Sequence, residues 1–263
     1  MVMTLVLAIA ALGGDISGPE ALGLTIRIPG GKTVEPGRGT KLVVEFRNLT
    51  PSPLYVMRST VVGASELNLQ ATHGDCSYEP VPFYADLPET MNRYYYVPLL
   101  GADRALMEEL VLNDPEEPGS VQLPLGRPGR YRLKAHFRSN EHWVMGVFWP
   151  IWGGETSSAE IEFELTTASP NSISKWRSRL LDDSPEAVTY FRHVADPAAA
   201  DTLIGILEKD PVRYGLVPAI LKQGRQADAE RLMRAAERDG ISDARRQLFR
   251  GAAETLTKTD ACR

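Results

Sequence analysis

The feature that most constrains this chain is a change in the spacing of its apolar residues near position 166. Before that position, apolar and polar residues alternate over short runs, which is typical of half-buried β-strands. After it, apolar residues recur every three or four positions, as they do on the buried face of an α-helix. Because the two spacings suit different kinds of layer, the sequence predicts a region of strands followed by a region of helices.

Strand-like alternation is clearest in three runs. Lys41–Arg47, Arg130–Arg138 and Ala159–Leu165 each place apolar residues on one face and mostly charged residues on the other. Clusters of Gly, Pro and Asn separate such runs at intervals that suit a sandwich of two sheets. Residues 77–120 are less regular, and we expect one or two strands there, one of them at Ala105–Leu112. The strands should therefore pack into an antiparallel sandwich.

Helical spacing begins after a short polar linker, Thr166–Asn171. Two segments carry apolar residues at i, i+3, i+4 and i+7: Ala200, Leu203, Ile204 and Leu207, then Ala229, Leu232, Met233 and Ala236. The segments also match in sequence, since Ala198, Ala200, Leu203, Glu208 and Asp210 recur as Ala227, Ala229, Leu232, Glu237 and Asp239. With partner helices expected at residues 212–223 and 243–257, the pattern indicates a repeated helix pair.

Several segments also resemble known families. In the strand region these are Thr25–Ile28, Val34–Gly37, Leu42–Asn48, Pro128–Ser139, Trp152-x-Gly154 and Ser157–Ile161. Together they look like the opening and closing strands of Ig-like sandwich domains of secreted bacterial proteins, which implies an exported binding or spacer module. Residues 184–257 are similar to HEAT-like helical repeats, which commonly serve as protein-interaction surfaces. Neither family brings catalytic residues to this chain.

The expected fold class is therefore α+β multidomain. Residues 20–167 should form an N-terminal antiparallel Ig-like β-sandwich domain, and residues 172–263 a C-terminal all-α domain of HEAT-like helical repeats. A hydrophobic fraction of 43% with 24% charged residues is normal for packed globular domains. The net charge of -5 argues against nucleic acid as a partner, because phosphate binding needs a basic excess.

Residues 1–14 form an apolar run with an A-x-A site at Ala8–Ala10, which is typical of a signal peptide. The run lacks the usual basic start, and its other interpretations are a misplaced start codon or a buried strand or helix. It is too short to cross a bilayer, which needs about 20 apolar residues. We expect a protein exported to the periplasm or the cell exterior, with no stable membrane insertion of the mature chain.

The two cysteines are Cys76 and Cys262. An even count suits a disulfide between them in an oxidising compartment. The alternative is two unrelated thiols. If they are paired, the C-terminal tail must dock on the sandwich.

Three segments resemble catalytic or metal motifs. Gly30–Thr33 ends like a phosphate-binding loop, but Ile26 replaces its first glycine and a strand should follow. Gly63–Ser65 begins like a nucleophile elbow, but Leu67 replaces the closing glycine. His73–Cys76 could supply a nucleophile and base or metal ligands, yet a structural zinc site needs about four ligands and the other histidines lie on separate elements. No catalytic residue, metal site or cofactor is predicted.

Charged residues form two opposed faces on the last expected strands. The basic face is Arg130, Arg132, Lys134, His136 and Arg138, and the acidic face is Glu160, Glu162 and Glu164. The basic face taken alone would suit an acidic partner. If the strands pair as a hairpin, the opposite charges face one another and contribute roughly 0.2 to 1 kcal/mol per pair. The sequence therefore favours a solvated charge ladder.

An aromatic segment, residues 140–158, is the candidate binding surface. It holds Trp143, Phe148, Trp149 and Trp152. Loops at one end of an Ig-like sandwich carry binding residues, and Trp is enriched at interface hot spots. The alternative is that the segment covers the open end of the sandwich and its aromatic rings belong to the core.

The predicted function is that of an exported, non-enzymatic binding or adaptor protein. Its sandwich loops and helical repeats would offer surfaces to a protein partner in the cell envelope or outside the cell. The alternative is a secreted inhibitor or carbohydrate-recognising module that uses the aromatic segment 140–158.

Overall fold

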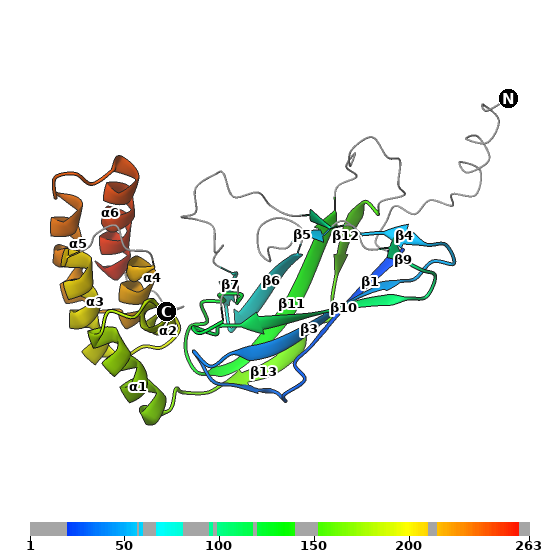
Figure 1. The fold of residues 1–263 in the computed structure, drawn as a ribbon, viewed down its shortest axis with the longest axis horizontal. Coiled ribbons are helices and arrows are strands. Elements are labelled where there is room, and N and C mark those ends of the chain that lie inside the picture. Colours follow the sequence, from blue (N-terminus) through cyan, green and yellow to red (C-terminus); the bar gives the residue numbers. More distant parts are fainter. Residues whose placement is uncertain are drawn as a thin grey trace.

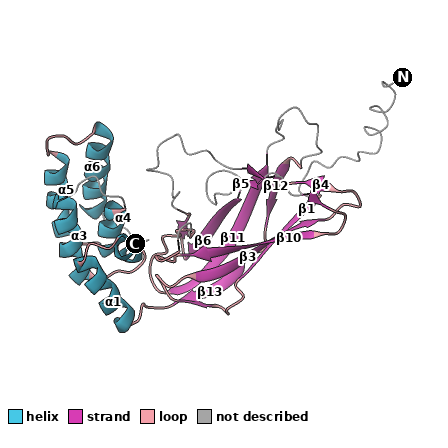
Figure 2. Ribbon diagram, in the orientation of Figure 1, coloured by secondary structure: helices cyan, strands magenta, loops and turns pink. Residues whose placement is uncertain are grey.

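A computed structural model describes residues 20–56, 58–59, 67–80, 95–96, 99–117, 120–139, 152–209 and 215–257. Within them the strands come first and the helices follow, and the helices lie to one side of the sheets (Figures 1 and 2). The chain is thus a mixed structure of mainly antiparallel sheets and α-helices, in the order that the apolar spacing predicts. The predicted signal peptide, residues 1–14, lies outside the described residues.

The smaller sheet is antiparallel and has the strand order β1-β3-β10. Its strands are β1 (Leu22–Arg27), β3 (Thr40–Asn48) and β10 (Ala105–Leu112). Strand β3 lies in the middle, and Leu42, Val44 and Phe46 on its inward face are fully buried. The alternation predicted for Lys41–Arg47 is confirmed, and β10 has the predicted bounds.

The larger sheet has the order β2-β13-β11-β6-β7, with β12 paired to β11 as well. Its strands are β2 (Thr33–Val34), β6 (Leu67–His73), β7 (Cys76–Tyr78), β11 (Gly129–Ser139), β12 (Gly154–Ser157) and β13 (Ile161–Leu165). Short pairs join β4 (Leu54–Tyr55) to β9 (Leu99–Leu100) and β5 (Arg58–Ser59) to β8 (Tyr95–Tyr96). The expected antiparallel arrangement needs one correction, because β2 and β13 are parallel.

The last strand is also shorter than predicted. It begins at Ile161 rather than Ala159, because Ser158 interrupts the edge that β12 and β13 share along β11. The Ser158 backbone N–H donates to the carbonyl of Ala135 (2.9 Å), and its hydroxyl accepts from the Ala135 N–H (3.0 Å). The expected pairing with residues 130–138 is present. Along the chain, however, β12 comes between β11 and β13 and pairs with the far end of β11.

The two sheets share one hydrophobic cluster and pack face to face. Phe46 of β3 meets Phe137 of β11 edge-on, with ring centroids 5.0 Å apart. Tyr131 of β11 stacks on Phe163 of β13 at 5.4 Å. Large rings therefore fill the space between the layers.

The helices run from Pro170 to Thr257. They are α1 (Pro170–Leu181), α2 (Pro185–Phe191), α3 (Pro197–Lys209), α4 (Leu216–Gln223), the 3-10 turn η1 (Gln226–Asp228), α5 (Ala229–Ala236) and α6 (Asp243–Thr257). Helix α3 packs on α4, and α5 on α6. Their apolar faces form a second cluster, separate from that of the sheets. No helix in the part of the chain that the structure describes is long and apolar enough to cross a membrane.

The predicted linker Thr166–Asn171 is too long, because α1 already begins at Pro170. The Ser169 hydroxyl accepts from the backbone N–H of Ser172 (3.2 Å), which caps the helix. Proline suits the first helical position, where its missing N–H costs nothing. Ser184 caps α2 in the same way ahead of Pro185.

Candidate functional site

The aromatic segment can be placed only at its end. Trp152 is fully buried, stacks on Phe137 at 5.6 Å, and donates its backbone N–H to the carbonyl of Tyr55 (2.7 Å). An indole with no exposed surface cannot anchor a ligand, so Trp152 belongs to the core and not to a binding surface. Trp143, Phe148 and Trp149 lie outside the described residues, and their binding role stays a prediction.

His73–Cys76 is the turn of the β6–β7 hairpin, in which His73 and Cys76 are paired and Gly74 has a φ of 57°. The Nδ1–H of His73 donates to the Arg130 carbonyl (2.8 Å), and the ring stacks on Tyr131 at 4.7 Å. Cys76 is disulfide-bonded. Because Cys262 lies outside the described residues, the Cys76–Cys262 pair itself stays a prediction. Among the described residues, no group of three His, Cys, Asp or Glu side chains could hold a metal ion.

Gly30–Thr33, the segment that resembles the end of a phosphate-binding loop, leads through a turn into β2. Gly31 has a φ of 103° there. A strand and not a helix follows, as the sequence predicts, so the phosphate-binding geometry of a helix N-terminus does not arise.

The two charged faces oppose one another as expected. Arg130 lies opposite Glu164 and Arg132 opposite Glu162 in the β11–β13 register. Arg132 forms an ion pair with Glu160 at 3.5 Å, and the two side chains are 55% and 49% exposed. Such exposed pairs contribute little free energy, and this face of the sheet is a solvated charge ladder.

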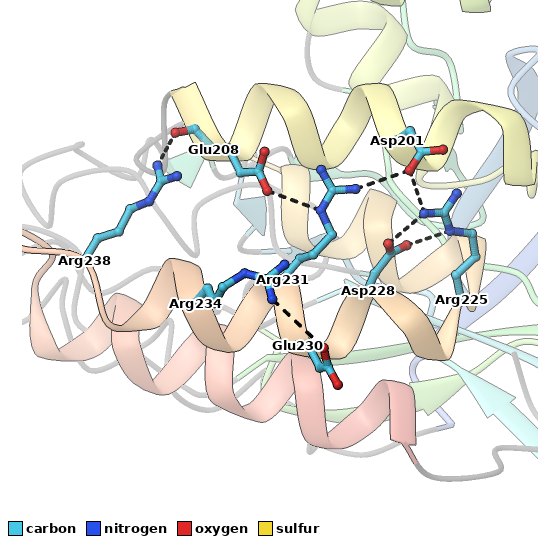
Figure 3. A network of polar contacts seen from close by, with 8 residues as sticks. All are labelled: Asp201, Glu208, Arg225, Asp228, Glu230, Arg231, Arg234 and Arg238. Atoms are coloured by element: carbon cyan, nitrogen blue, oxygen red, sulfur yellow. Dashed lines mark hydrogen bonds and ion pairs between the residues drawn. The ribbon is translucent and has the colours of Figure 1, made fainter.

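A network of arginines and carboxylates joins α3 to η1 and α5 (Figure 3). Arg225 and Arg231 reach Asp201 of α3 from two sides, at 2.8 and 3.2 Å. Arg225 also donates two hydrogen bonds, of 2.9 and 2.8 Å, to the carboxylate of Asp228. The Asp228 side chain is only 1% exposed. The hydrogen bond from Arg225 lowers the pKa of Asp201, and the bonds to both carboxylates raise the pKa of Arg225.

The network continues along α5. Arg231 also donates to Glu208 of α3 at 3.2 Å, and Arg238 donates to the backbone carbonyl of Glu208. Arg234 and Glu230 form an exposed pair within α5 at 4.0 Å. Three arginines reach α3: one from the residue before η1, one from α5 and one from the turn after α5. The network therefore holds two successive helix pairs together.

Buried and half-buried polar side chains join the sheets to the helices. The segment Ser120–Gly126 lies against α4 and the turn after α2. Gln122 accepts a hydrogen bond from the Nε2–H of His193 (2.5 Å), and Lys222 of α4 donates to the carbonyls of Leu125 (2.6 Å) and Gly126 (2.8 Å). We call this contact the junction.

The junction alters the titration of its two basic groups. Burial lowers the pKa of Lys222 to about 8. Burial, followed by the charges of Arg192 and Lys222, lowers the pKa of His193 to about 3. His193 is therefore neutral in the folded protein near neutral pH.

Further contacts cross the same boundary. The backbone N–H of Ser169 donates to Glu35 (3.0 Å), and Arg179 and Lys175 pair with Glu116. Gly37 has a φ of 69° and lies so close to Tyr190 that a Cβ would fall 2.5 Å from the ring. The sheets and helices thus meet mostly through polar groups and close backbone packing.

Within the helices, Gln223 and Asp196 stabilise the turn that carries His193 to the junction. Arg177 holds Asp196 with bonds of 2.9 and 3.0 Å, and the Asp196 backbone N–H donates to Gln223 (2.6 Å). The Gln223 amide in turn donates to the carbonyls of Phe191 (3.0 Å) and Ala219 (2.9 Å). These bonds fix the turn that carries His193.

The junction leaves no local pattern in the sequence. His193 and Gln122 are 71 positions apart, and Lys222 lies 97 positions from Leu125. No local spacing links such residues, and each alone looks like an ordinary polar residue.

No family model and no curated protein matches this chain. Among solved structures, it is similar to a β-glucosidase from Listeria innocua in complex with isofagomine, at 11% identity and a TM-score of 0.27, over 56% of this chain and 16% of that one. It is also similar to the CARDB domain of a Pyrococcus furiosus protein, at 11% identity and a TM-score of 0.26, over 56% of this chain and 94% of that domain. This chain thus spans a small part of the glucosidase, and neither likeness carries an argument about function.

Proposed function

We propose that this chain is an exported, non-enzymatic binding or adaptor protein, with an Ig-like sandwich and a HEAT-like helical array that each present a surface to a protein partner. Within the aromatic segment, Trp143, Phe148 and Trp149 would belong to the sandwich surface, whereas the fully buried Trp152 would not. The partner would lie in the cell envelope or outside the cell.

A hydrogen bond at the start of β11 supports an Ig-like sandwich. The Tyr131 hydroxyl donates to the backbone carbonyl of Arg127 (2.7 Å), four residues upstream. In Ig-like domains a tyrosine near the start of one strand makes this kind of bond back to the preceding corner. Burial and the neighbouring Tyr78 raise the pKa of the Tyr131 hydroxyl, so it stays protonated and keeps donating.

Equivalent burial in two helix pairs supports a repeated array. Ala200 and Leu203 of α3 correspond in sequence to Ala229 and Leu232 of α5, and all four are buried. Each of these helices packs on the helix that follows it, and arginines join the two pairs. Stacked pairs of this kind form extended surfaces that bind other proteins.

The observation that carries the non-enzymatic proposal is where the groups with shifted pKa lie. Those among the described residues are Tyr131, Tyr190, His193, Asp201, Lys222 and Arg225. Each is in the core, at the junction or in the arginine network. Catalytic groups with shifted pKa values typically gather in one cleft, but structural contacts shift pKa values too. The shifts here follow structural contacts.

A crosslinked pull-down from the native envelope fraction tests the proposal. The helical surface is probed with Met233→Asp and Leu248→Asp, since these side chains on α5 and α6 are 38% and 47% exposed. Methionine is enriched at interfaces and Asp is depleted there, so each change should weaken capture of a partner of the helices. Met107→Asp is the matched control, because Met107 is 60% exposed on the sheet. If Met233→Asp and Leu248→Asp capture the partner as well as Met107→Asp does, this helical surface is ruled out.

The aromatic segment needs its own variants, Trp143→Ala and Trp149→Ala. If these residues anchor a ligand, capture should be lost while the melting temperature stays unchanged. If they are core, each change should cost about 3 to 5 kcal/mol of stability, and binding through this segment is excluded. Binding to a glycan array or inhibition of a protease would instead favour the alternative of a carbohydrate-recognising module or an inhibitor.

A further inference from the structure

The junction is held by polar contacts rather than by a hydrophobic core shared between the sheets and the helices. The buried apolar residues of the sheets and of the helices form two separate clusters. The hydrogen bonds by which we define the junction are the His193–Gln122 bond and the two bonds from Lys222 to backbone carbonyls. Polar groups of this kind can exchange their partners for water at small net cost.

His193 is the group at the junction on which a proton is costly as long as the ring stays buried. Its Nε2–H is already donated to Gln122, and no described residue accepts a hydrogen bond from its Nδ1. A proton on Nδ1 would create a charged donor that is buried and unpaired, which is costly. Protonation therefore favours any state in which the ring meets water.

The charges that face His193 act in the same direction. Arg192 from its own turn and Lys222 from α4 are both cationic. The segment Ser120–Gly126, which covers the ring from the sheet side, contains no charged residue. The backbone of Leu123 favours the protonated ring, but its influence is smaller than that of burial and of the two cations. Elsewhere on the boundary, the carboxylates are Glu35 and Glu116.

We propose that the junction is an acid-sensitive contact, in which protonation of His193 releases the segment Ser120–Gly126 from α4 and the turn after α2 while the sheets and the helices each stay folded. Acidification would thereby loosen the contact between the sheets and the helices at the junction, while the other contacts across the boundary remain. The inference does not depend on the proposed function or on any partner.

The sign of the effect follows from proton binding. An exposed histidine titrates at 6.5, whereas the buried ring takes up a proton only at about 3. Between these values the open state binds the extra proton and the closed state does not. The ratio of open to closed molecules should therefore rise about tenfold for each pH unit below 6.5, and it should be constant above that pH.

Hydrogen exchange of the intact full-length chain between pH 7 and 4 tests the proposal. Rates are corrected for the intrinsic effect of pH and read at residues 120–126 and 215–223, and far-UV circular dichroism monitors folding. The wild type should lose protection in both segments, reversibly and with unchanged dichroism. His193→Gln should keep its protection, because an amide can still donate to Gln122 but does not titrate.

Two controls separate His193 from other acid effects. His73→Gln and His136→Gln remove histidines outside the junction and should behave like the wild type. Equal loss of protection in wild type and His193→Gln would assign the effect to Glu35 and Glu116 and overturn the proposal. Wild-type protection that is unchanged down to pH 4, or lost together with the dichroism, would also overturn it.

If His193→Gln does not fold at pH 7, Gln122→Glu replaces it. A carboxylate at position 122 would pair with the protonated ring in the closed state. The loss of protection on acidification should then be smaller than in the wild type. An equal or greater loss would contradict the proposal.

Discussion

The interiors of the two regions differ most in how many alanines they contain. Large rings lie in both, since Phe46, Tyr131, Phe137, Trp152 and Phe163 fill the space between the sheets, and Trp176, Tyr190, Phe191 and Phe249 lie in the helical cluster. The helical cluster also contains many alanines, among them Ala187, Ala199, Ala219, Ala229, Ala235, Ala236, Ala252 and Ala253. Sheets that pack face to face lie about 10 Å apart and need long side chains to fill the gap. Helices approach to 8–10 Å depending on the side chains at the contact, and alanine permits the closer distance.

The regions also differ in how they use charge. On the sheets, opposite charges face one another across exposed strands, as Arg132 and Glu160 do. On the helices, Arg225 holds the nearly buried carboxylate of Asp228 and the exposed Asp201 together. From these differences we expect the stability of the sheets to fall most when buried volume is removed. The stability of the helices should fall most when volume is added or when an arginine of the network is lost.

The largest effect should come from Trp152→Ala in the sheet core. Removing a fully buried indole should cost about 3 to 5 kcal/mol, because the stacked Phe137 cannot fill the cavity. Hydrogen exchange should show lost protection in β3 and β11 but not in α3. Trp176→Ala is the counterpart, since Trp176 is buried in the helical cluster. The same pattern of exchange in both variants would mean that the two cores do not respond separately.

Arg225→Ala should have the next largest effect. It leaves the Asp228 carboxylate, whose side chain is 1% exposed, without the cation that holds it, which should cost about 3 kcal/mol. Urea unfolding followed by circular dichroism measures the loss. Arg225→Lys should recover only part of it, because an ammonium cannot reproduce the two bonds to Asp228. If Arg225→Ala lowers the free energy of unfolding by less than an exposed ion pair contributes, which is up to about 1 kcal/mol, the network does not stabilise the fold.

Added volume in the helices should cost somewhat less. Ala200→Leu inserts a larger side chain at a fully buried position of α3 and should cost about 1 to 3 kcal/mol. The matched control is Ala198→Leu, since Ala198 is exposed near the start of the same helix. If both variants melt alike, the helices do not pack closely at Ala200.

The smallest effect should follow Arg132→Ala on the charge ladder. Its exposed pair with Glu160 should contribute about 0.2 to 1 kcal/mol, and salt should remove the difference from the wild type. Thermal unfolding at low and high salt measures this. If Arg132→Ala lowers stability as much as Arg225→Ala does, the exposed pairs of the sheets and the arginine network of the helices do not differ in what they contribute.

Local patterns in the sequence were enough to predict the order of the two regions. Alternation over Lys41–Arg47 and Arg130–Arg138, and helical spacing around Leu203 and Leu232, depend only on which face of each element is buried. The same physics placed β10 at Ala105–Leu112 and set the basic and acidic rows opposite one another. A further local signal was available but unused: Ser169-Pro170 and Ser184-Pro185 mark the starts of α1 and α2.

Other features depended on residues far apart in the chain. Whether Trp152 is core or surface was decided by Phe137 of β11 and by Tyr55 of β4, which lie far from it in the sequence. The parallel pairing of β2 with β13 joins positions near 34 and 165. Neither leaves a pattern within a short window, because burial and register there depend on which distant strand arrives as neighbour.

The junction shows most clearly the difference between what a local sequence pattern determines and what distant contacts determine. In the sequence, His193 and Lys222 are isolated basic residues that would titrate normally in water. Their pKa values fall because folding removes water around them, and for His193 also because Arg192 and Lys222 place positive charge nearby. Desolvation is a property of the assembled interface, so only the tertiary structure could decide the charge of these groups.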